Sequence, residues 1–147
     1  MTQATPATRR LARYLLELEM KASDEPQVEA IGALRVFEKL QNYLSKLIGI
    51  AGFQALLSRA LTLAKSESTW LNEVHVQANS RLVGFSETAL KYSQQDVTDG
   101  NAALLSQFLG LLNTFIGEAL TLRLVNEVWP EAQLIDANLS TEERVLE

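Results

Sequence analysis

The chain has 147 residues, 47% of them hydrophobic and 21% charged, which is typical of one folded domain and excludes a chain that is disordered throughout. It contains no cysteine, so disulfides, thiolate nucleophiles and cysteine metal sites are excluded, and we expect a reducing, cytoplasmic location. The formal net charge of −5 argues against nucleic acid as the main partner, because phosphate binding needs a positive surface.

The first predicted helix spans residues 6–23. Thr5 is a good capping residue, the proline after it needs no N–H partner at the first helical position, and apolar residues then recur at helical spacing. Arg9, Arg10 and Arg13 fall in the opening turns, where the helix dipole disfavours cations. These three arginines are either simply solvated or form a basic patch that binds an anion or an acidic partner.

Two further helices are predicted on either side of a short connection that contains two glycines, Gly49 and Gly52. Asp24 is a good cap for the first of these helices, whose inward apolar stripe includes Leu47. The second spans about residues 53–66, and a connection this short makes the two helices antiparallel neighbours. An anion site at the glycines is the alternative to a turn, but the lysine and the preceding strand of a P-loop are missing.

A β-hairpin is predicted at about residues 74–85, where the helical period fails. Residues 74–77 alternate between apolar and polar, and the four residues after them have turn chemistry. Trp70 and Leu71 are expected to anchor the entrance of the hairpin, because two strands alone are only marginally stable. Ser86 is then a suitable cap for a short helix. A polar link over residues 94–100 follows this helix.

Residues 101–129 form the most informative predicted element, a long helix that ends before Pro130. Large apolar residues, Phe115 among them, cover well over half of its circumference, so the helix is buried in a core or crosses a membrane. Glu118 and Arg123 oppose a membrane span, because a charge near the centre of a spanning helix costs about 2.5–3.5 kcal/mol. We therefore expect a long buried C-terminal helix and no membrane span.

The remaining side of this helix carries small or polar residues at alternating steps of four and three. Each glycine among them lowers helix propensity by roughly 1 kcal/mol relative to alanine, so a close neighbour is expected there. That neighbour is either another helix of the same chain or a partner, and Glu118, if buried, needs an arginine partner or a proton. The predicted interaction seam consists of Ala103, Gln107, Gly110, Thr114, Gly117, Glu118 and Thr121.

Residues 131–147 are acidic and contain few large apolar side chains. We interpret them as an acidic, partly flexible C-terminal tail, so that the helical domain itself spans residues 1–130. A capping-box pattern at residues 140–143 predicts a short helix within the tail. A docking peptide is the alternative interpretation.

The sequence lacks the residue patterns of the common catalytic and metal sites. A single histidine, His75, without any cysteine cannot supply the usual ligands of a zinc or copper site. There is no P-loop and no Gly-x-Ser-x-Gly motif. We therefore expect no metal and no cofactor, and we assign no catalytic residue.

Together these observations predict a mostly α, single-domain bundle of four to five helices with a small β-hairpin insertion at about residues 74–85. The leading functional hypothesis is a non-enzymatic helical protein–protein interaction module, a regulatory or adaptor subunit of a bacterial assembly, that associates as a homodimer. The second hypothesis is a small-ligand sensor with a pocket between helices near Gly110, Gly117 and Glu118. The third is an enzyme that uses Glu118 or His75.

Overall fold

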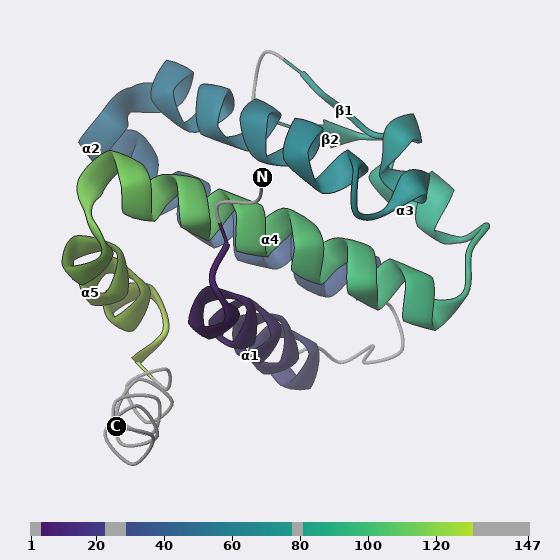
Figure 1. Ribbon diagram of the computed structural model, residues 1–147, viewed down its shortest axis with the longest axis horizontal. Coiled ribbons are helices and arrows are strands. Elements are labelled where there is room, and N and C mark those ends of the chain that lie inside the picture. The colour runs from purple at the N-terminus through teal and green to yellow at the C-terminus, as the bar shows by residue number, and fades with distance from the viewer. Residues whose placement is uncertain (1–3, 23–28, 78–80, 131–147) are drawn as a thin grey trace.

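The computed structural model describes residues 4–22, 29–77 and 81–130, and it is a mostly α bundle with a small hairpin, as predicted (Figure 1). The predicted tail at residues 131–147 and the predicted cap Asp24 lie outside the described residues. In chain order the elements are α1 (Pro6–Ala22), α2 (Glu29–Lys65), the 3-10 helix η1 (Thr69–Glu73), β1 (His75–Val76), β2 (Leu82–Val83), α3 (Phe85–Ala89), α4 (Gln94–Ile116) and α5 (Glu118–Val128).

Helix α1 begins at the predicted cap. The backbone N–H of Thr8 donates to Oγ1 of Thr5 at 3.2 Å, which satisfies one of the amides that a helix N-terminus leaves without a partner. Leu11 and Leu15, one turn apart, are buried on the inner face. The predicted first helix is therefore confirmed.

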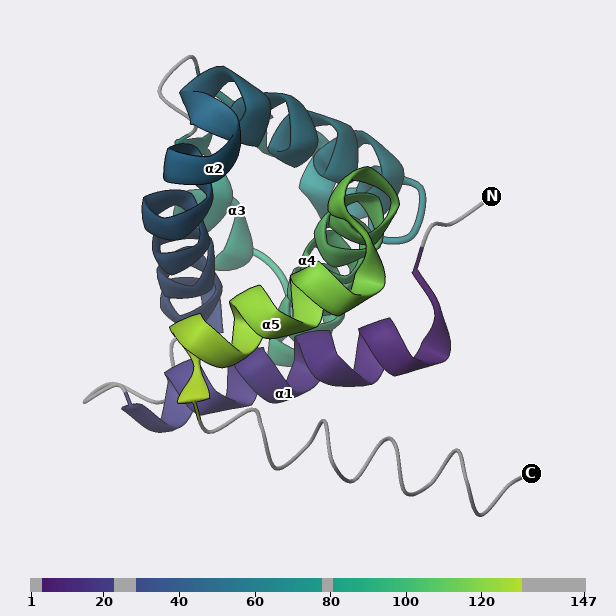
Figure 2. The same ribbon diagram turned by 90° about the vertical axis from the view of Figure 1, so that its left-hand side faces the viewer.

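Helix α2 contains both of the helices predicted between residues 24 and 66. They are separated by one residue, Gly49, with φ 82° and ψ 163°, a backbone conformation that glycine adopts far more readily than other residues. The four-residue connection expected at this place is thus shorter than predicted, because residues 50–52 are already helical. The chain turns back at Gly49, so the first arm of α2 (residues 29–48) and its second arm (residues 50–65) run in opposite directions along α4 (Figures 1 and 2).

The predicted hairpin is confirmed. β1 and β2 are antiparallel, with His75 opposite Val83 and Val76 opposite Leu82, while residues 78–80 at its tip lie outside the described residues. Trp70 and Leu71, which precede the hairpin, are both buried. The short helix α3 that follows begins after a left-handed glycine, Gly84, rather than at the predicted cap.

The polar link predicted over residues 94–100 is instead the first part of α4. Ser93 caps this helix, since its Oγ accepts a hydrogen bond from the N–H of Asp96 at 3.1 Å.

At the other end of α4, the prediction of one continuous helix over residues 101–129 is wrong. Gly117, with φ 95° and ψ 149°, separates α4 from α5, and α5 folds back toward α1 (Figure 2).

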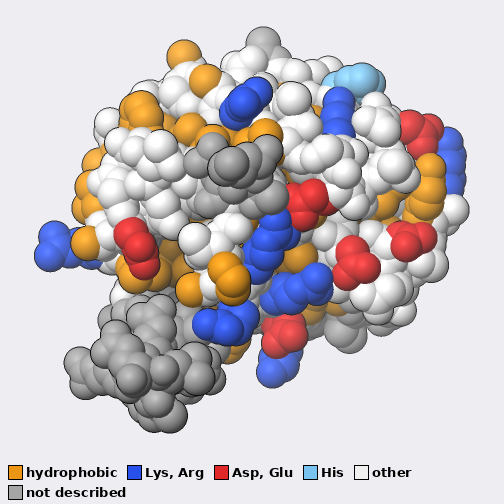
Figure 3. Space-filling view, viewed as in Figure 1, with side chains coloured by type: hydrophobic (Ala, Val, Ile, Leu, Met, Phe, Trp, Pro, Cys, Tyr) orange, Lys and Arg blue, Asp and Glu red, His pale blue; other side chains and the backbone are white. Residues whose placement is uncertain are grey.

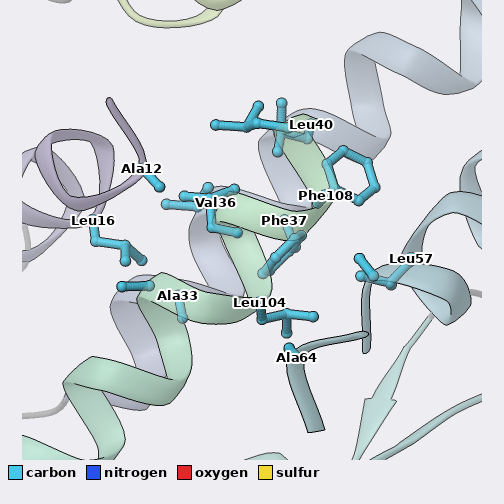
Figure 4. Packing of buried hydrophobic residues seen from close by; sticks show 14 of the residues in the cluster. Ala12, Leu16, Ala33, Val36, Phe37, Leu40, Leu57, Ala64, Leu104 and Phe108 are labelled. Atoms are coloured by element: carbon cyan, nitrogen blue, oxygen red, sulfur yellow. The ribbon is translucent and has the colours of Figure 1, made fainter. Parts of the chain in front are cut away.

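Helix α4 is the centre of the core. All ten residues from 101 to 110 are buried, as predicted for this half of the long helix. Leu104 and Phe108 of α4 lie between the two arms of α2 (Figure 4). The ring of Phe108 meets those of Phe37 and Phe53 at centroid distances of 5.7 and 5.4 Å, in arrangements that aromatic pairs favour. This packing holds α1, α2 and α5 around a single apolar helix.

Candidate interaction surface

The residues of the predicted interaction seam fall into two groups by their exposure. Ala103, Gln107, Gly110 and Thr121 are buried against other elements of the same chain, whereas Thr114, Gly117 and Glu118 are exposed. Thr114 and Thr121 each donate a hydroxyl hydrogen bond to the carbonyl four residues earlier in the chain. The seam is therefore no continuous surface here, and most of its length is an intramolecular packing face.

Gln107 belongs to a polar cluster that joins α4, α1 and the turn after α2. Its Nε2 donates to Oε2 of Glu67 at 2.5 Å, and Arg9 forms an ion pair with Oε1 of the same carboxylate at 2.9 Å. Burial acts to raise the pKa of Glu67, but the hydrogen bonds from Arg9 and Gln107, together with the charge of Arg9, outweigh burial, so this pKa lies below its ordinary value.

Most of the predicted basic patch forms ion pairs with acidic side chains of the same chain. Arg9 pairs with Glu67, and Arg13 pairs with Asp99 at 3.4 Å. Arg10 is exposed on the same helix. Two of the three arginines thus contribute to contacts between helices, and their charge is balanced within the chain.

Among the described residues, the carboxylate that is buried is Glu19, and no pattern in the sequence singles it out. Its side chain is 4% exposed. It accepts a hydrogen bond from Nε1 of Trp129 at 2.8 Å and forms an ion pair with Lys39. These contacts join the end of α1, the first arm of α2 and the residue that follows α5. By contrast Glu118, for which burial was considered, is exposed.

A pocket of about 280 Å³ lies between α1 and the first half of α4. Its wall includes Leu16, Met20 and Ala102, with Arg13 and Lys21 also contributing. The residues near which a pocket was predicted, Gly110, Gly117 and Glu118, are not among those that line this one. His75 and Glu118, the candidates of the enzyme hypothesis, do not line it either, and no group of three or more metal-binding side chains occurs among the residues that the structure describes.

Two bends expose large apolar side chains at the same end of the molecule (Figures 1 and 2). Beside Gly49, Leu47 is 59% and Ile50 61% exposed; beside Gly117, Phe115 is 64% and Leu120 44% exposed. Hydrophobic side chains gather at this end in the space-filling view, on its left-hand side (Figure 3). We call Leu47, Ile50, Phe115 and Leu120 the apolar end.

The sequence placed Leu47 and Phe115 in the core, and this prediction is wrong. Their positions follow the apolar stripes of their helices, but the chain changes direction two residues after each of them. The neighbouring helix that would have covered them turns away with the bend. A glycine two residues later is no sufficient signal of this exposure, because Phe108 stands two residues before Gly110 and is buried.

The stretch Gly32–Lys65 of α2 is long and apolar enough to cross a membrane by length and composition alone, a test that core helices of water-soluble proteins also pass. In this structure the stretch is bent at Gly49. Only 28% of its most apolar window is buried inside the molecule. Within the described part of α2, the large apolar side chains that are exposed are Leu47 and Ile50, on either side of the bend.

Comparison with protein-family models, with curated proteins and with solved structures found no match for this chain. The functional argument therefore depends on the geometry described above.

Proposed function

We propose that this chain is a non-enzymatic helical interaction module that binds a second copy of itself through the apolar end. The observation that carries the proposal is the exposure of four large apolar side chains, Leu47, Ile50, Phe115 and Leu120, at one end of the molecule. Single exposed apolar residues are ordinary on protein surfaces, but a group of them at one place is typical of an interaction site.

The composition of the two bends favours a protein partner over a lipid surface. From Leu47 to Ala55 the chain carries no charged residue, and Lys46 is the one cation immediately before this stretch. A surface that binds anionic lipid normally adds several lysines or arginines around its apolar residues. The net charge of −5 opposes such binding further.

A second copy fits the apolar end because one positive and one negative side chain lie beside it and can pair between the two copies. Lys46 lies next to one bend and Glu118 next to the other, and both are exposed. In a two-fold symmetric dimer the same patch meets itself, so Lys46 of one copy can face Glu118 of its partner. Each charge then assists specificity while the apolar side chains supply most of the affinity.

The test replaces one apolar residue by a charge and measures the molar mass in solution by light scattering. Wild type is expected to be a dimer, and Leu47→Glu a folded monomer, because dimerisation would bury an unpaired carboxylate. Leu90→Glu is the matched control: Leu90 is 86% exposed but directly follows α3, which lies at the opposite end of the molecule (Figure 1), so this variant is expected to remain a dimer.

Two results would refute the proposal. One is a wild type that remains monomeric at concentrations of several hundred micromolar. The other is a Leu47→Glu variant that stays dimeric. Binding of wild type, and not of Leu47→Glu, to vesicles of neutral phospholipid would assign the apolar end to a membrane surface instead.

The pocket between α1 and α4 supports a second candidate function, the binding of a small ligand. Its apolar wall suits a small molecule with an apolar body, and Lys21 offers a cation for a carboxylate on that molecule, although Glu17 also lines the pocket and Arg13 is paired with Asp99. A thermal-shift series of short-chain carboxylic acids tests this idea, with Ala102→Met to fill the pocket. A melting temperature that no acid raises in wild type, or that rises equally in Ala102→Met, would exclude it.

A further inference from the structure

Gly117 is the only residue between α4 and α5, and its conformation is the whole of the connection. Its φ of 95° and ψ of 149° belong to a region that only glycine populates readily. A Cβ atom at this position would meet no other atom within 4 Å. The bend is thus confined to the backbone of one residue, and no packing at Gly117 itself holds it.

The last helical hydrogen bond of α4 and the first of α5 both involve Gly117. The N–H of Gly117 donates to the carbonyl of Asn113 at 2.9 Å, and the N–H of Thr121 donates to the carbonyl of Gly117 at 3.0 Å. Both bonds have the four-residue spacing of an α-helix. The amides of residues 118–120, in the first turn of α5, have no partner within α5. A helical Gly117 would therefore join α4 and α5 and give these amides helical acceptors.

Glycine is the one helix stop signal at this boundary in the sequence, and glycine can also continue a helix. Gly117 offers no side chain to cap α5, and no proline occurs between residues 101 and 129. The local sequence is compatible with both the bent and the straight chain. Long-range contacts must decide between them.

Those contacts are made by the inner face of α5 and the residue that follows it. Thr121, Leu124 and Val125 are buried, and Trp129 is buried with its indole N–H on Glu19 of α1. If residues 94–128 formed one straight helix, these side chains would no longer pack against the rest of their own chain. The surface that they vacate would fit the α5 of another copy equally well.

We propose that two copies of this chain exchange α5, each with a straight helix over residues 94–128 and with α5 packed on the body of its partner. Exchange of an identical element is a low-cost route to a dimer, because every closed contact is formed again between chains. Phe115 and Leu120, exposed on either side of Gly117 in the bent chain, would lie where the two straight helices pass each other. The inference rests on the proposed function in that it takes a second copy as the partner.

Gly117→Ala tests the role of the bend. Alanine is strained in the bent conformation and unstrained in a helix, so the variant is expected to shift the equilibrium toward the exchanged dimer by about 5- to 150-fold per chain. Gly52→Ala is the matched control, because Gly52 is already helical and its added methyl group meets only the side chain of Ile48. A further variant, with Ser-Gly-Gly inserted after Gly117, is expected to be more monomeric than wild type, since it cannot form the continuous helix.

Energy transfer between labels identifies the exchange directly. The chain has no cysteine, so Arg123→Cys on α5 and Arg10→Cys on α1, both at exposed positions, each provide one site for a dye. The experiment uses the Leu47→Glu background, which removes docking through the apolar end. The reference is the energy-transfer efficiency between the two dyes of a single chain. This chain carries both cysteines, the Leu47→Glu substitution and the Ser-Gly-Gly insertion.

Gly117→Ala chains that carry only the donor dye are mixed with Gly117→Ala chains that carry only the acceptor dye. In their exchanged dimer, the transfer efficiency between the two chains is expected to equal this reference. The dimer is also expected to form and dissociate slowly, because α5 must first leave its body. No transfer between chains, or Gly117→Ala no more dimeric than Gly52→Ala, overturns the exchange. Loss of the wild-type dimer in Leu47→Glu would still support docking through the apolar end, so the two proposals fail separately.

Discussion

The sharpest stability prediction concerns Gly100, where α4 passes directly beneath the indole of Trp70. A Cβ atom at residue 100 would lie 2.3 Å from Nε1 and 2.6 Å from Cε2 of Trp70. This indole is buried, donates to the carbonyl of Asp96 at 2.9 Å and packs against the ring of Phe85 at a centroid distance of 5.4 Å. Gly100→Ala therefore forces Trp70 to move out of the position in which it makes these two contacts.

The magnitude follows from what Trp70 loses when it moves. The hydrogen bond to Asp96 contributes about 1 kcal/mol, the aromatic contact with Phe85 about 0.5–1.5 kcal/mol, and the overpacking itself costs about 1–3 kcal/mol. Alanine regains about 1 kcal/mol of helix propensity relative to glycine. The free energy of unfolding of Gly100→Ala should thus be lower than that of wild type by about 2–4 kcal/mol.

Urea unfolding, followed by circular dichroism, measures this difference. Gly52→Ala is the control, because its methyl group approaches only the side chain of Ile48, at 3.2 Å, and it should change stability by less than about 1 kcal/mol. A double-mutant cycle with Trp70→Leu isolates the clash, since Gly100→Ala should cost much less once the indole is absent. Equal losses in both backgrounds, or a Gly100→Ala variant as stable as wild type, would refute the reasoning.

Two further predictions concern the carboxylates that join the helices. The pKa of Glu67 is lower in the folded than in the unfolded chain, so its stabilisation is present above the ordinary pKa and is lost as the pH falls through the folded value. Urea midpoints between pH 6 and pH 3 should therefore fall less steeply in Glu67→Gln than in wild type, and parallel curves would contradict the assignment. Trp129→Phe removes a donor from the buried carboxylate of Glu19 and should lower the free energy of unfolding by about 1.5–3 kcal/mol. Leu90→Phe, at an exposed site, is its control, and equal midpoints for both variants would show that the hydrogen bond contributes nothing.

These carboxylates also show why the sequence could not supply the candidate site. Glu19 and Trp129 are 110 residues apart, and neither lies in a pattern that indicates a partner. Gln107 and Glu67 are likewise brought together only by the packing of α4 on α2. Polar contacts between distant helices have no periodicity to reveal them, whereas a cap such as Thr5 acts within one turn of its own helix.

The features that could be predicted from the sequence are local ones. Capping residues and apolar periodicity were sufficient to predict α1, the two arms of α2, the hairpin and the burial of residues 101–110. The separation of α4 from α5 and the exposure of Leu47 and Phe115 depend instead on how the folded helices pack. The physical reason lies in Gly117, which can adopt helical and positive φ values at similar cost. Its conformation is therefore selected by the burial of α5 and Trp129 against the rest of the chain.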